Sequence, residues 1–372
     1  MRSLMNEFLR YIENVLDAAL SNDASTIKQS YKVKVEEDVP GILFIPRFPT
    51  NLILNTETYY KIYDIISPAV YPKYTCVRPS SMQIVEVANE TISTARGFFY
   101  PWKKGKSKRL VGKLDDILVK YDLQKEIPLM DGISVGRNAT SYIVSGNTGA
   151  GKSVAIQYLI RTLERTTNRS RTKKARVIVI DPKKSDGARY AKRHPEIELV
   201  VPDIDDRPED FLVKVTEKIA NIVHELYRRQ ELLYQNSTRI STDANEIDVV
   251  PIWLFIEEMG AITLGLSPNS RQVKDFFEEL ELIALLGREA LIGFVLTSQI
   301  ARNDVIPIPI RSQANVRILL GRIDKSTVQY LFPSMTEGLS IPISGKGTGI
   351  VEINDGRHFG AEPIAMPTIV ED

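Results

Sequence analysis

Residues Ser145-Gly146-Asn147-Thr148-Gly149-Ala150-Gly151-Lys152-Ser153 follow the pattern G-x-x-x-x-G-K-[ST], a phosphate-binding loop. An apolar run at residues 142–144 precedes the loop, and a helix-like run at 154–160 follows it. This strand–loop–helix context distinguishes a real P-loop from a chance match. Glycines let the backbone N–H groups turn inward around a phosphate, and the following helix directs its positive N-terminus at the same anion. The stretch therefore predicts a nucleoside triphosphate site.

The chemistry of the loop assigns a role to each residue type. Lys152 can reach the β- and γ-phosphates, and Ser153 can offer its hydroxyl to Mg²⁺. The loop predicts a nucleoside triphosphate and Mg²⁺ as cofactors, and no motif in the sequence separates ATP from GTP. The predicted nucleotide-binding residues are Gly146, Asn147, Thr148, Gly149, Ala150, Gly151, Lys152, Ser153 and Val154.

The composition limits the class of protein. The chain has 372 residues, 43% hydrophobic and 26% charged, which predicts two domains with ordinary apolar cores. The formal net charge of +1 neither requires nor excludes nucleic acid, so any DNA site must be local. The single cysteine, Cys76, excludes an internal disulfide framework and fits a reducing cytosol. We expect no membrane-spanning segment and no signal peptide.

The order of apolar runs predicts an α/β core. Strand-like runs at 176–180, 249–258 and 292–297 alternate with helical patterns at 208–234 and 272–287, which is typical of a mostly parallel sheet. Before the P-loop, short strands and one helical stretch predict a smaller N-terminal α+β domain. We therefore expect an accessory or oligomerisation domain at 1–125 and a motor domain at 126–372.

Two polar stretches lie between these elements. Residues 165–176 hold six Lys and Arg side chains between a helix and a strand, and we interpret them as a solvated loop. Residues 236–247 are polar without periodicity and predict a second surface loop.

The second half of an NTPase site is an apolar strand that ends in acidic residues, and Glu257-Glu258 fits this pattern. Glu257 would hold Mg²⁺, usually through water, and Glu258 would orient the attacking water. The usual first residue is Asp, so Glu257 is longer by one methylene group. Gln299 ends the next core strand and should lie at the same sheet edge, where it could sense the γ-phosphate.

Taken together, these motifs resemble the FtsK/SpoIIIE branch of the HerA–FtsK ATPases, including the TcpA-type coupling ATPases of Gram-positive conjugative elements. The resemblance covers about 230 residues, and the first 125 or so carry no matching motif. The matching segments, besides the P-loop, are 127–132, Asp181-Pro182-Lys183-Lys184, the strand ending in Glu257-Glu258, Gly287-Arg288-Glu289-Ala290, Leu296-Thr297-Ser298-Gln299 and 310–317.

This resemblance implies a RecA-like P-loop motor that pumps double-stranded DNA as a homo-hexameric ring. It implies Glu257 as the metal-side acid, Glu258 as the catalytic acid and Gln299 as the sensor. Arg288 is the implied arginine finger, which would reach the γ-phosphate of a neighbouring subunit. Arg317 and Arg322 are second choices.

The same resemblance implies a cytoplasmic ATPase that serves conjugation or maintenance of a mobile element. A relaxase or a membrane-channel protein is an expected partner, which would hold the ATPase peripherally at the membrane. We expect DNA contacts from loops 264–271 and 301–309, through Arg271, Arg302 and Asn303. The family's fullest form also has a transmembrane segment and a C-terminal winged helix, neither of which we find.

Two alternatives stay open. The chain could be a motor for protein secretion or virion packaging, in which case the tips of the two loops should be apolar. It could also be an NTP-gated adaptor that hydrolyses slowly and recruits a partner through its N-terminal domain.

Overall fold

The computed structural model describes residues 2–20, 30–36, 40–50, 53–106, 108–237, 240, 242–323, 325–333, 335 and 345–370. The chain divides into two compact units. Unit 1 comprises residues 1–107 with 359–362, and unit 2 comprises 108–358 with 363–372. The division follows Ser107, whereas the sequence placed it after residue 125.

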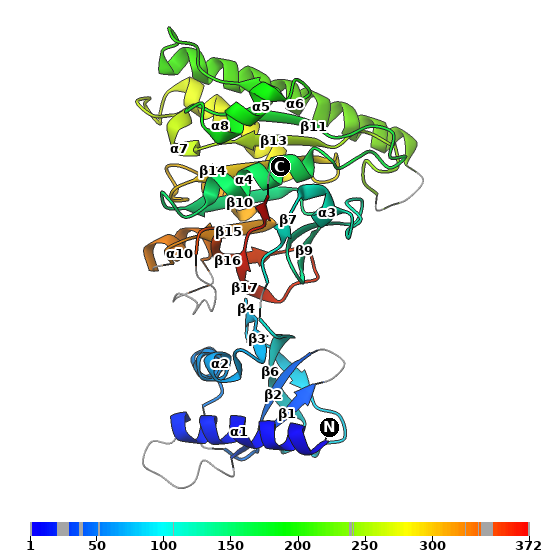
Figure 1. Ribbon diagram of the computed structural model, residues 1–372, viewed down its shortest axis with the longest axis vertical. Helices are drawn as coiled ribbons and strands as arrows, with labels where there is room; N and C mark the ends of the chain where they lie inside the picture. The colour runs from blue at the N-terminus through cyan, green and yellow to red at the C-terminus, as the bar shows by residue number, and fades with distance from the viewer. Residues whose placement is uncertain are drawn as a thin grey trace. The chain divides into compact units, whose positions relative to one another are not determined.

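Unit 1 is a small α+β domain (Figure 1). Five of its described strands form an antiparallel sheet in the order β1-β2-β6-β3, with β5 also pairing with β6. Ile12 and Leu16 of α1 are fully buried, so this amphipathic helix covers its own domain. The elements are α1 (Arg2–Leu20), β1 (Tyr31–Glu36), β2 (Gly41–Pro46), α2 (Thr56–Val70), β3 (Tyr74–Cys76), β4 (Arg78–Pro79), β5 (Ile84–Glu86) and β6 (Arg96–Lys104).

Unit 2 contains the main sheet, in which the described strands run β12-β11-β13-β14-β10-β15-β16-β17. The six strands from β12 to β15 in this order are parallel, and β16 pairs with β15 in the antiparallel direction. The strands are β10 (Ser141–Gly146), β11 (Arg176–Ile180), β12 (Glu198–Val200), β13 (Ile252–Ile256), β14 (Ile292–Ser298), β15 (Val316–Leu320), β16 (Thr348–Ile353) and β17 (Gly360–Ala365).

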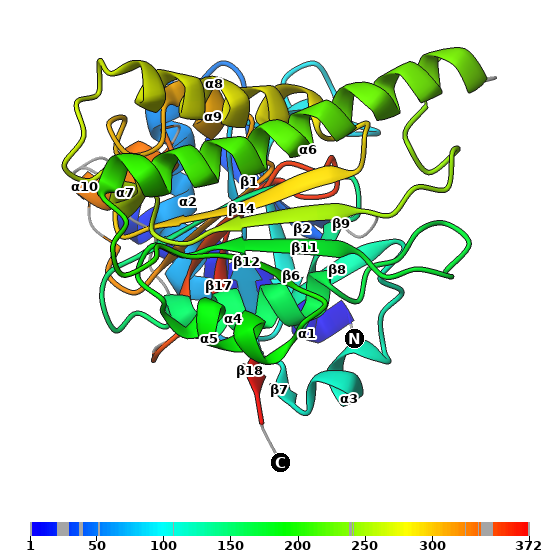
Figure 2. The same ribbon diagram turned by 90° about the horizontal axis from the view of Figure 1, so that it is seen from above.

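Helices cover both faces of this sheet (Figure 2). Helices α6 (Pro208–Asn236) and α8 (Arg271–Leu286) lie on one face, and α4 (Lys152–Leu163) and α5 (Asp186–Arg193) lie on the other. Every residue of β10, β13 and β14 is buried, which explains their near-continuous apolar sequences. The predicted RecA-like α/β core with a mostly parallel sheet is confirmed.

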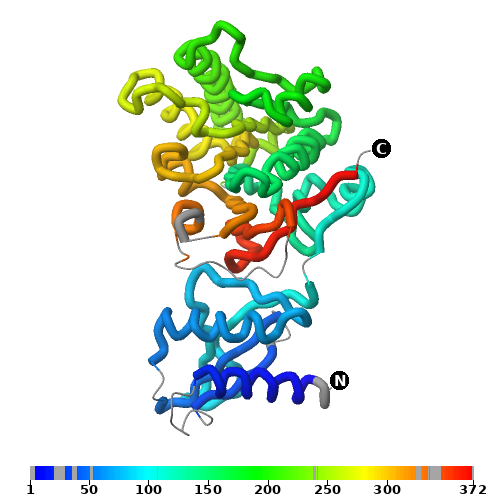
Figure 3. Tube along the Cα trace, turned by 60° about the vertical axis from the view of Figure 1, so that its left-hand side comes forward, coloured from blue at the N-terminus to red at the C-terminus, as the bar shows by residue number. Residues whose placement is uncertain are grey.

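Short elements complete unit 2. The C-terminal β18 runs alongside β7, with which it pairs in parallel (Figure 3). Within the described ranges, no helix combines the length and apolar character needed to cross a bilayer. The remaining elements are β7 (Val111–Gly112), α3 (Leu114–Leu118), β8 (Glu126–Met130), β9 (Ile133–Gly136), α7 (Met259–Ile262), α9 (Ile308–Ser312), α10 (Lys325–Leu331) and β18 (Thr368–Ile369).

Candidate active site

The P-loop joins the carboxyl end of β10 to the amino end of α4, as its sequence context predicts. Gly149 and Gly151 have φ angles of 83° and 96°, in the left-handed region that favours glycine. Gly151 is the N-cap of α4, and its carbonyl accepts a hydrogen bond from the N–H of Ala155. The loop therefore directs the start of α4 toward the position that a phosphate would take.

Two glycine turns from other strands brace the P-loop. The N–H of Gly347 donates to the carbonyl of Ala150 at 2.7 Å, and a Cβ on Gly151 would lie 2.4 Å from that same nitrogen. Gly321, with φ +83°, approaches Ala150 so closely that an added Cβ would lie 2.6 Å from the alanine Cβ. The sequence motifs did not mark either glycine, and the only signal for them was the glycine-rich stretch around residue 347.

Arg109 is a third residue that the sequence did not mark. Its guanidinium donates to the carbonyl of Lys346 at 2.5 Å and to the Thr368 hydroxyl at 3.1 Å. It therefore ties the turn at Gly347 to the C-terminal segment, beside the P-loop.

Glu258 lies directly after β13 and is held among cations and an amide. One carboxylate oxygen lies 3.1 Å from Lys152 Nζ and 3.4 Å from Lys183 Nζ, and the other accepts from the backbone N–H of Gln299 at 3.2 Å. Its backbone is left-handed, with φ 52°, and its N–H donates to the Thr297 hydroxyl. Burial raises the pKa of Glu258, but Lys152, Lys183 and the Gln299 N–H outweigh burial and hold the pKa below its ordinary value. Glu258 is therefore a carboxylate at neutral pH.

Glu257 has a different environment. It is only 8% exposed, and its Oε2 lies 2.9 Å from the Ser185 hydroxyl. Its Oε1 has no hydrogen-bond partner in the described part of the chain and contacts Gly187, where a Cβ would lie 1.7 Å away. Burial and the neighbouring Asp181 raise the pKa of Glu257 to about 7.

Ser185 links the two buried carboxyl groups. Its hydroxyl lies 2.7 Å from Asp181 and 2.9 Å from Glu257. Asp181 is fully buried and accepts from the N–H groups of Lys183 and Ser185. One hydroxyl hydrogen can serve only one carboxylate at a time. A proton on Glu257 would donate to Ser185, which would then donate to Asp181.

The other predicted residues at this edge are accessible. Ser153 and Val154 are exposed on the first turn of α4, and the side chain of Gln299 is exposed. The backbone of Gln299 is fixed, because its N–H donates to Glu258 and its carbonyl accepts from the Ser145 hydroxyl at 3.1 Å. The structure thus brings the P-loop, Glu258 and the backbone of Gln299 together.

The residues present fit a nucleoside triphosphate, since the glycine conformations and Lys152 form a phosphate cradle. The exposed Ser153 hydroxyl fits as a ligand of Mg²⁺. Glu257 does not, because its carboxyl group is hydrogen-bonded to the Ser185 hydroxyl. Among the described residues, no group of three or more His, Cys, Asp or Glu side chains is placed to hold a metal ion. The magnesium site would therefore depend on oxygen atoms of the nucleotide.

Arg288 lies at the opposite edge of the sheet. It precedes β14, which is parallel to β10, whereas the P-loop follows β10. Its exposed side chain therefore cannot reach the P-loop of its own chain. Arg317 is mostly buried and pairs with Glu352 at 3.0 Å, and Arg322 follows β15, at the same edge as the P-loop.

The two loops predicted to contact DNA line one cavity of about 570 Å³ together with Lys183, Glu258 and Gln299. Arg302 pairs with Asp304 at 3.0 Å, and Arg271 lies 3.6 Å from Asp275. Asn303 accepts a hydrogen bond from Arg311. Apolar side chains also line the cavity, namely Leu264, Leu266, Pro268, Val273, Phe277, Ile300 and Val305.

Comparison with known proteins adds information on the fold. No protein-family model matches the chain, and no curated protein matches it. The conjugation coupling protein TcpA of pCW3, solved as a monomer with ATPγS, matches with a TM-score of 0.53 and 15% identity over 97% of this chain and 95% of that one.

Two further solved structures match less of the fold. EssC ATPases 2 and 3 from Geobacillus thermodenitrificans match with a TM-score of 0.49 and 17% identity over 64% of this chain, which spans 42% of that one. The genome packaging NTPase B204 of Sulfolobus turreted icosahedral virus 2, in complex with AMP, matches with a TM-score of 0.36 and 13% identity over 62% of this chain and 99% of that one. At these identities the likeness concerns the fold. The chain has the fold of the TcpA coupling protein, and the predicted resemblance is confirmed at that level.

Proposed function

We propose that the chain is an ATP-hydrolysing motor that forms a homo-hexameric ring and translocates double-stranded DNA. The observation that carries this proposal is the position of Glu258, which is ionised and held between Lys152 of the P-loop and the backbone of Gln299. This arrangement places a charged acceptor beside the residue that would bind the terminal phosphates.

The geometry supports a division of roles. When a triphosphate occupies the P-loop, Lys152 turns from Glu258 toward the phosphates, and the carboxylate is released toward the attacking water. Because the pKa of Glu258 is low, it is a weak base and acts mainly by orienting the water. Attack at the γ-phosphorus then breaks the bond to the β–γ bridging oxygen. ATP with Mg²⁺ is the proposed substrate.

The position of Arg288 supports the proposed assembly. Because this residue lies at the edge opposite the P-loop, it can stabilise a γ-phosphate only in another copy of the chain. A head-to-tail contact of this kind closes into a ring when its rotation is a fraction of a full turn. The hexameric ring and the DNA substrate are the family's expectation for such a motor.

The proposed setting is the cytoplasm, at the membrane through a channel protein or beside a relaxase, in conjugative transfer or maintenance of a mobile element. Arg271, Arg302 and Asn303 are the proposed DNA contacts. Such contacts with the phosphate backbone carry no sequence information, which suits a translocating motor.

A second candidate is a motor that moves a polypeptide, as in secretion or packaging. The apolar lining of the cavity beside Glu258 favours it, as does Leu264, which is 71% exposed at the rim. An NTP-gated adaptor would instead show slow hydrolysis that no polymer stimulates.

ATP hydrolysis measured with and without double-stranded DNA tests the proposal. We expect DNA to stimulate the parent chain, and Lys152→Ala and Glu258→Gln to lower the rate by about 100-fold or more, because each removes a group of the phosphoryl-transfer site. Arg228→Ala is the control. Arg228 is exposed on α6, and its loss removes only a surface ion pair with Glu225, so this variant should hydrolyse ATP at the rate of the parent chain. Rapid hydrolysis that DNA leaves unchanged would contradict a DNA motor.

A further inference from the structure

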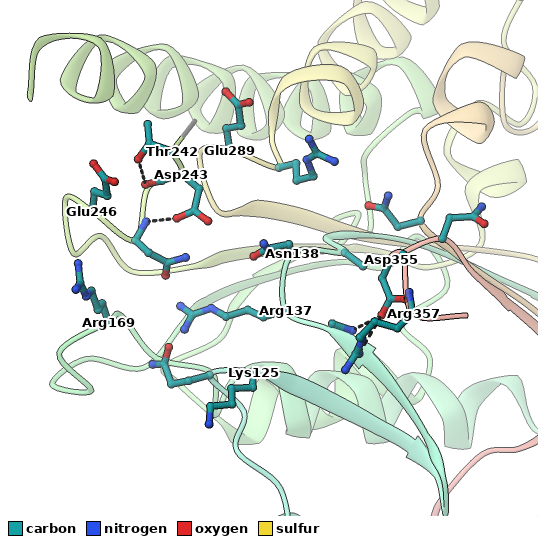
Figure 4. A pocket seen from close by; sticks show the side chains of 18 residues that line it. Lys125, Arg137, Asn138, Arg169, Thr242, Asp243, Glu246, Glu289, Asp355 and Arg357 are labelled. Atoms are coloured by element: carbon teal, nitrogen blue, oxygen red, sulfur yellow. Dashed lines mark hydrogen bonds and ion pairs between the residues drawn. The ribbon is translucent and has the colours of Figure 1, made fainter. Parts of the chain in front are cut away.

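A second large cavity, of about 990 Å³, lies at the amino-terminal edge of the parallel sheet (Figure 4). Most of its lining comes from segments that lie before the parallel strands. Residues 136–139 precede β10, Arg169 lies before β11, Arg288 and Glu289 precede β14, and Asn315 precedes β15. The cavity is therefore on the edge opposite the P-loop.

The cavity combines cations and carboxylates. In Figure 4, Lys125, Arg137 and Arg169 lie on one side, and Asp243 and Glu246 lie on the other. The amide residues Gln124, Asn138, Asn245, Asn315 and Asn354 also line it, so most of its side chains are polar. A concave polar surface with both charges suits a partner surface that also carries both.

The arginines of the cavity differ in whether their side chains have partners within the chain. Arg137 donates to the carbonyl of Thr167 at 2.8 Å, and Arg357 pairs with Asp355 at 2.9 Å. By contrast, no hydrogen bond or ion pair to another described residue is formed by the side chain of Arg169 or Arg288, and both residues are exposed. These two guanidinium groups are therefore available to an incoming anion.

Arg169 is also presented by a rigid loop. Thr167 and Lys174 form a β-bridge, and between them the side chain of Asn168, only 3% exposed, accepts from the backbone N–H groups of Thr172 and Lys173 at 3.0 and 2.9 Å. Asp248, from a separate loop, accepts from the N–H of Ser170 at 2.8 Å. The backbone next to Arg169 is thus fixed, which is how binding residues are usually supported.

The P-loop edge has the complementary charges. Lys183 and Lys184 after β11, and Lys346 before the antiparallel β16, are exposed there. If this edge meets the cavity of another copy, the lysines face carboxylates such as Asp243 and Glu246, and the phosphates face the unpaired arginines. The two edges of one sheet cannot meet in a single chain, so the contact needs two copies.

We propose that this cavity receives the nucleotide-bearing P-loop edge of a second copy of the chain, and that Arg169, in addition to Arg288, contacts the nucleotide's phosphates. This inference rests on the ring assembly of the proposed function. It adds a residue that no motif marks, from a stretch whose sequence predicted only a solvated loop.

The first test does not require hydrolysis. Self-association of the full chain is measured by sedimentation with and without ATPγS and Mg²⁺. ATPγS should promote association of the parent, and Arg169→Ala should need about tenfold more protein to associate, while it binds the nucleotide with the parent's affinity. Arg171→Ala is the matched control, because Arg171 is on the same loop but faces away, toward Asp122 at 3.0 Å, and it should associate like the parent.

The second test mixes variants. Arg169→Ala has an intact P-loop, and Lys152→Ala has an intact cavity. In a mixed assembly, some contacts therefore join the intact P-loop of one variant to the intact cavity of the other. The mixture should hydrolyse ATP faster than the sum of the two variants alone.

Parental association and hydrolysis by Arg169→Ala would overturn the role of Arg169. A parent chain that hydrolyses ATP but does not associate with ATPγS would overturn the second copy as the partner while leaving the ATPase intact. Association that depends on Arg169 in a chain without DNA-stimulated hydrolysis would support the contact and contradict the DNA motor instead.

Discussion

Two adjacent glutamates show how strongly the environment decides a residue's chemistry. Glu258 is ionised because Lys152 and Lys183 approach it, whereas Glu257 is buried beside Asp181 and has its pKa raised to about 7. Consecutive residues at the end of a strand point to different faces, so one points to the P-loop and the other to α5. The first acid of the pair is therefore protonated in part of the molecules at neutral pH.

This difference predicts opposite effects of pH on stability. The pKa of Glu257 is higher in the folded chain than its ordinary value of 4.5, so its stabilising contribution is complete below about pH 4.5 and is lost as the pH rises through 7. Glu257→Gln, which resembles the protonated form, should raise the free energy of unfolding at about pH 8 by about 3 kcal/mol and change it little at about pH 5. Denaturant unfolding at both pH values measures this.

Glu258→Gln is the control with the opposite sign. Its pKa is lowered in the folded chain, so its contribution is present above the ordinary value and is lost as the pH falls. This variant should be less stable than the parent at about pH 8. A loss of stability in Glu257→Gln at that pH would show that the Glu257 carboxyl is stabilised as an anion.

The sequence predicted the residues whose role is local. The P-loop and the acids after an apolar strand follow from short-range patterns, and the structure has them directly after β10 and β13. The orientation of Glu257 could not be predicted, because it depends on Ser185 and Gly187, which come from another segment. Arg169 was missed because the order of its loop depends on Asp248, far away in the sequence.

At the level of elements, the P-loop is supported by turns that follow β15 and precede β16. Gly347 has φ +76° and donates to Ala150, and its nearest side-chain neighbour would be Arg109, whose guanidinium lies 3.2 Å from an added Cβ. Gly347→Ala should cost about 1–2 kcal/mol of stability from backbone strain and should also weaken ATPγS binding, because the turn would move away from the loop.

Calorimetric titration of ATPγS into each variant measures this effect. Gly345→Ala is the matched control, since Gly345 has φ +105° but no atom within 4 Å of an added Cβ. It should show the strain without the loss of affinity. Equal affinities in the two variants would mean that the turn does not support the P-loop.

The main helices and strands of unit 2 were predictable because their apolar periods are long. The predicted helix at 208–234 is α6 (Pro208–Asn236), and that at 272–287 is α8 (Arg271–Leu286). Short elements such as β7 and β18 were not predictable, because each has two residues and exists only through pairing with the other. Their pairing joins Val111 to Thr368, which lie near opposite ends of unit 2 in the sequence.

At the scale of the whole molecule, the boundary between the units differs from the expected position for a physical reason. Leu114, Ile117 and Leu118 of α3 belong to the same hydrophobic core as Tyr142 of β10 and Leu159 of α4. Residues 108–125 carry no nucleotide motif, so only the packing of the folded chain shows that they belong to unit 2. Residues 359–362 are counted with unit 1, which a linear reading of the chain could not show.

The central claim is that hydrolysis at the P-loop moves double-stranded DNA, and displacement of a third strand from a linear duplex measures movement directly. We expect the parent chain to release a triplex-forming oligonucleotide in the presence of ATP and Mg²⁺, and we expect no release with ATPγS or with Glu258→Gln. Brisk ATP hydrolysis on the same DNA with the third strand still bound would contradict the account.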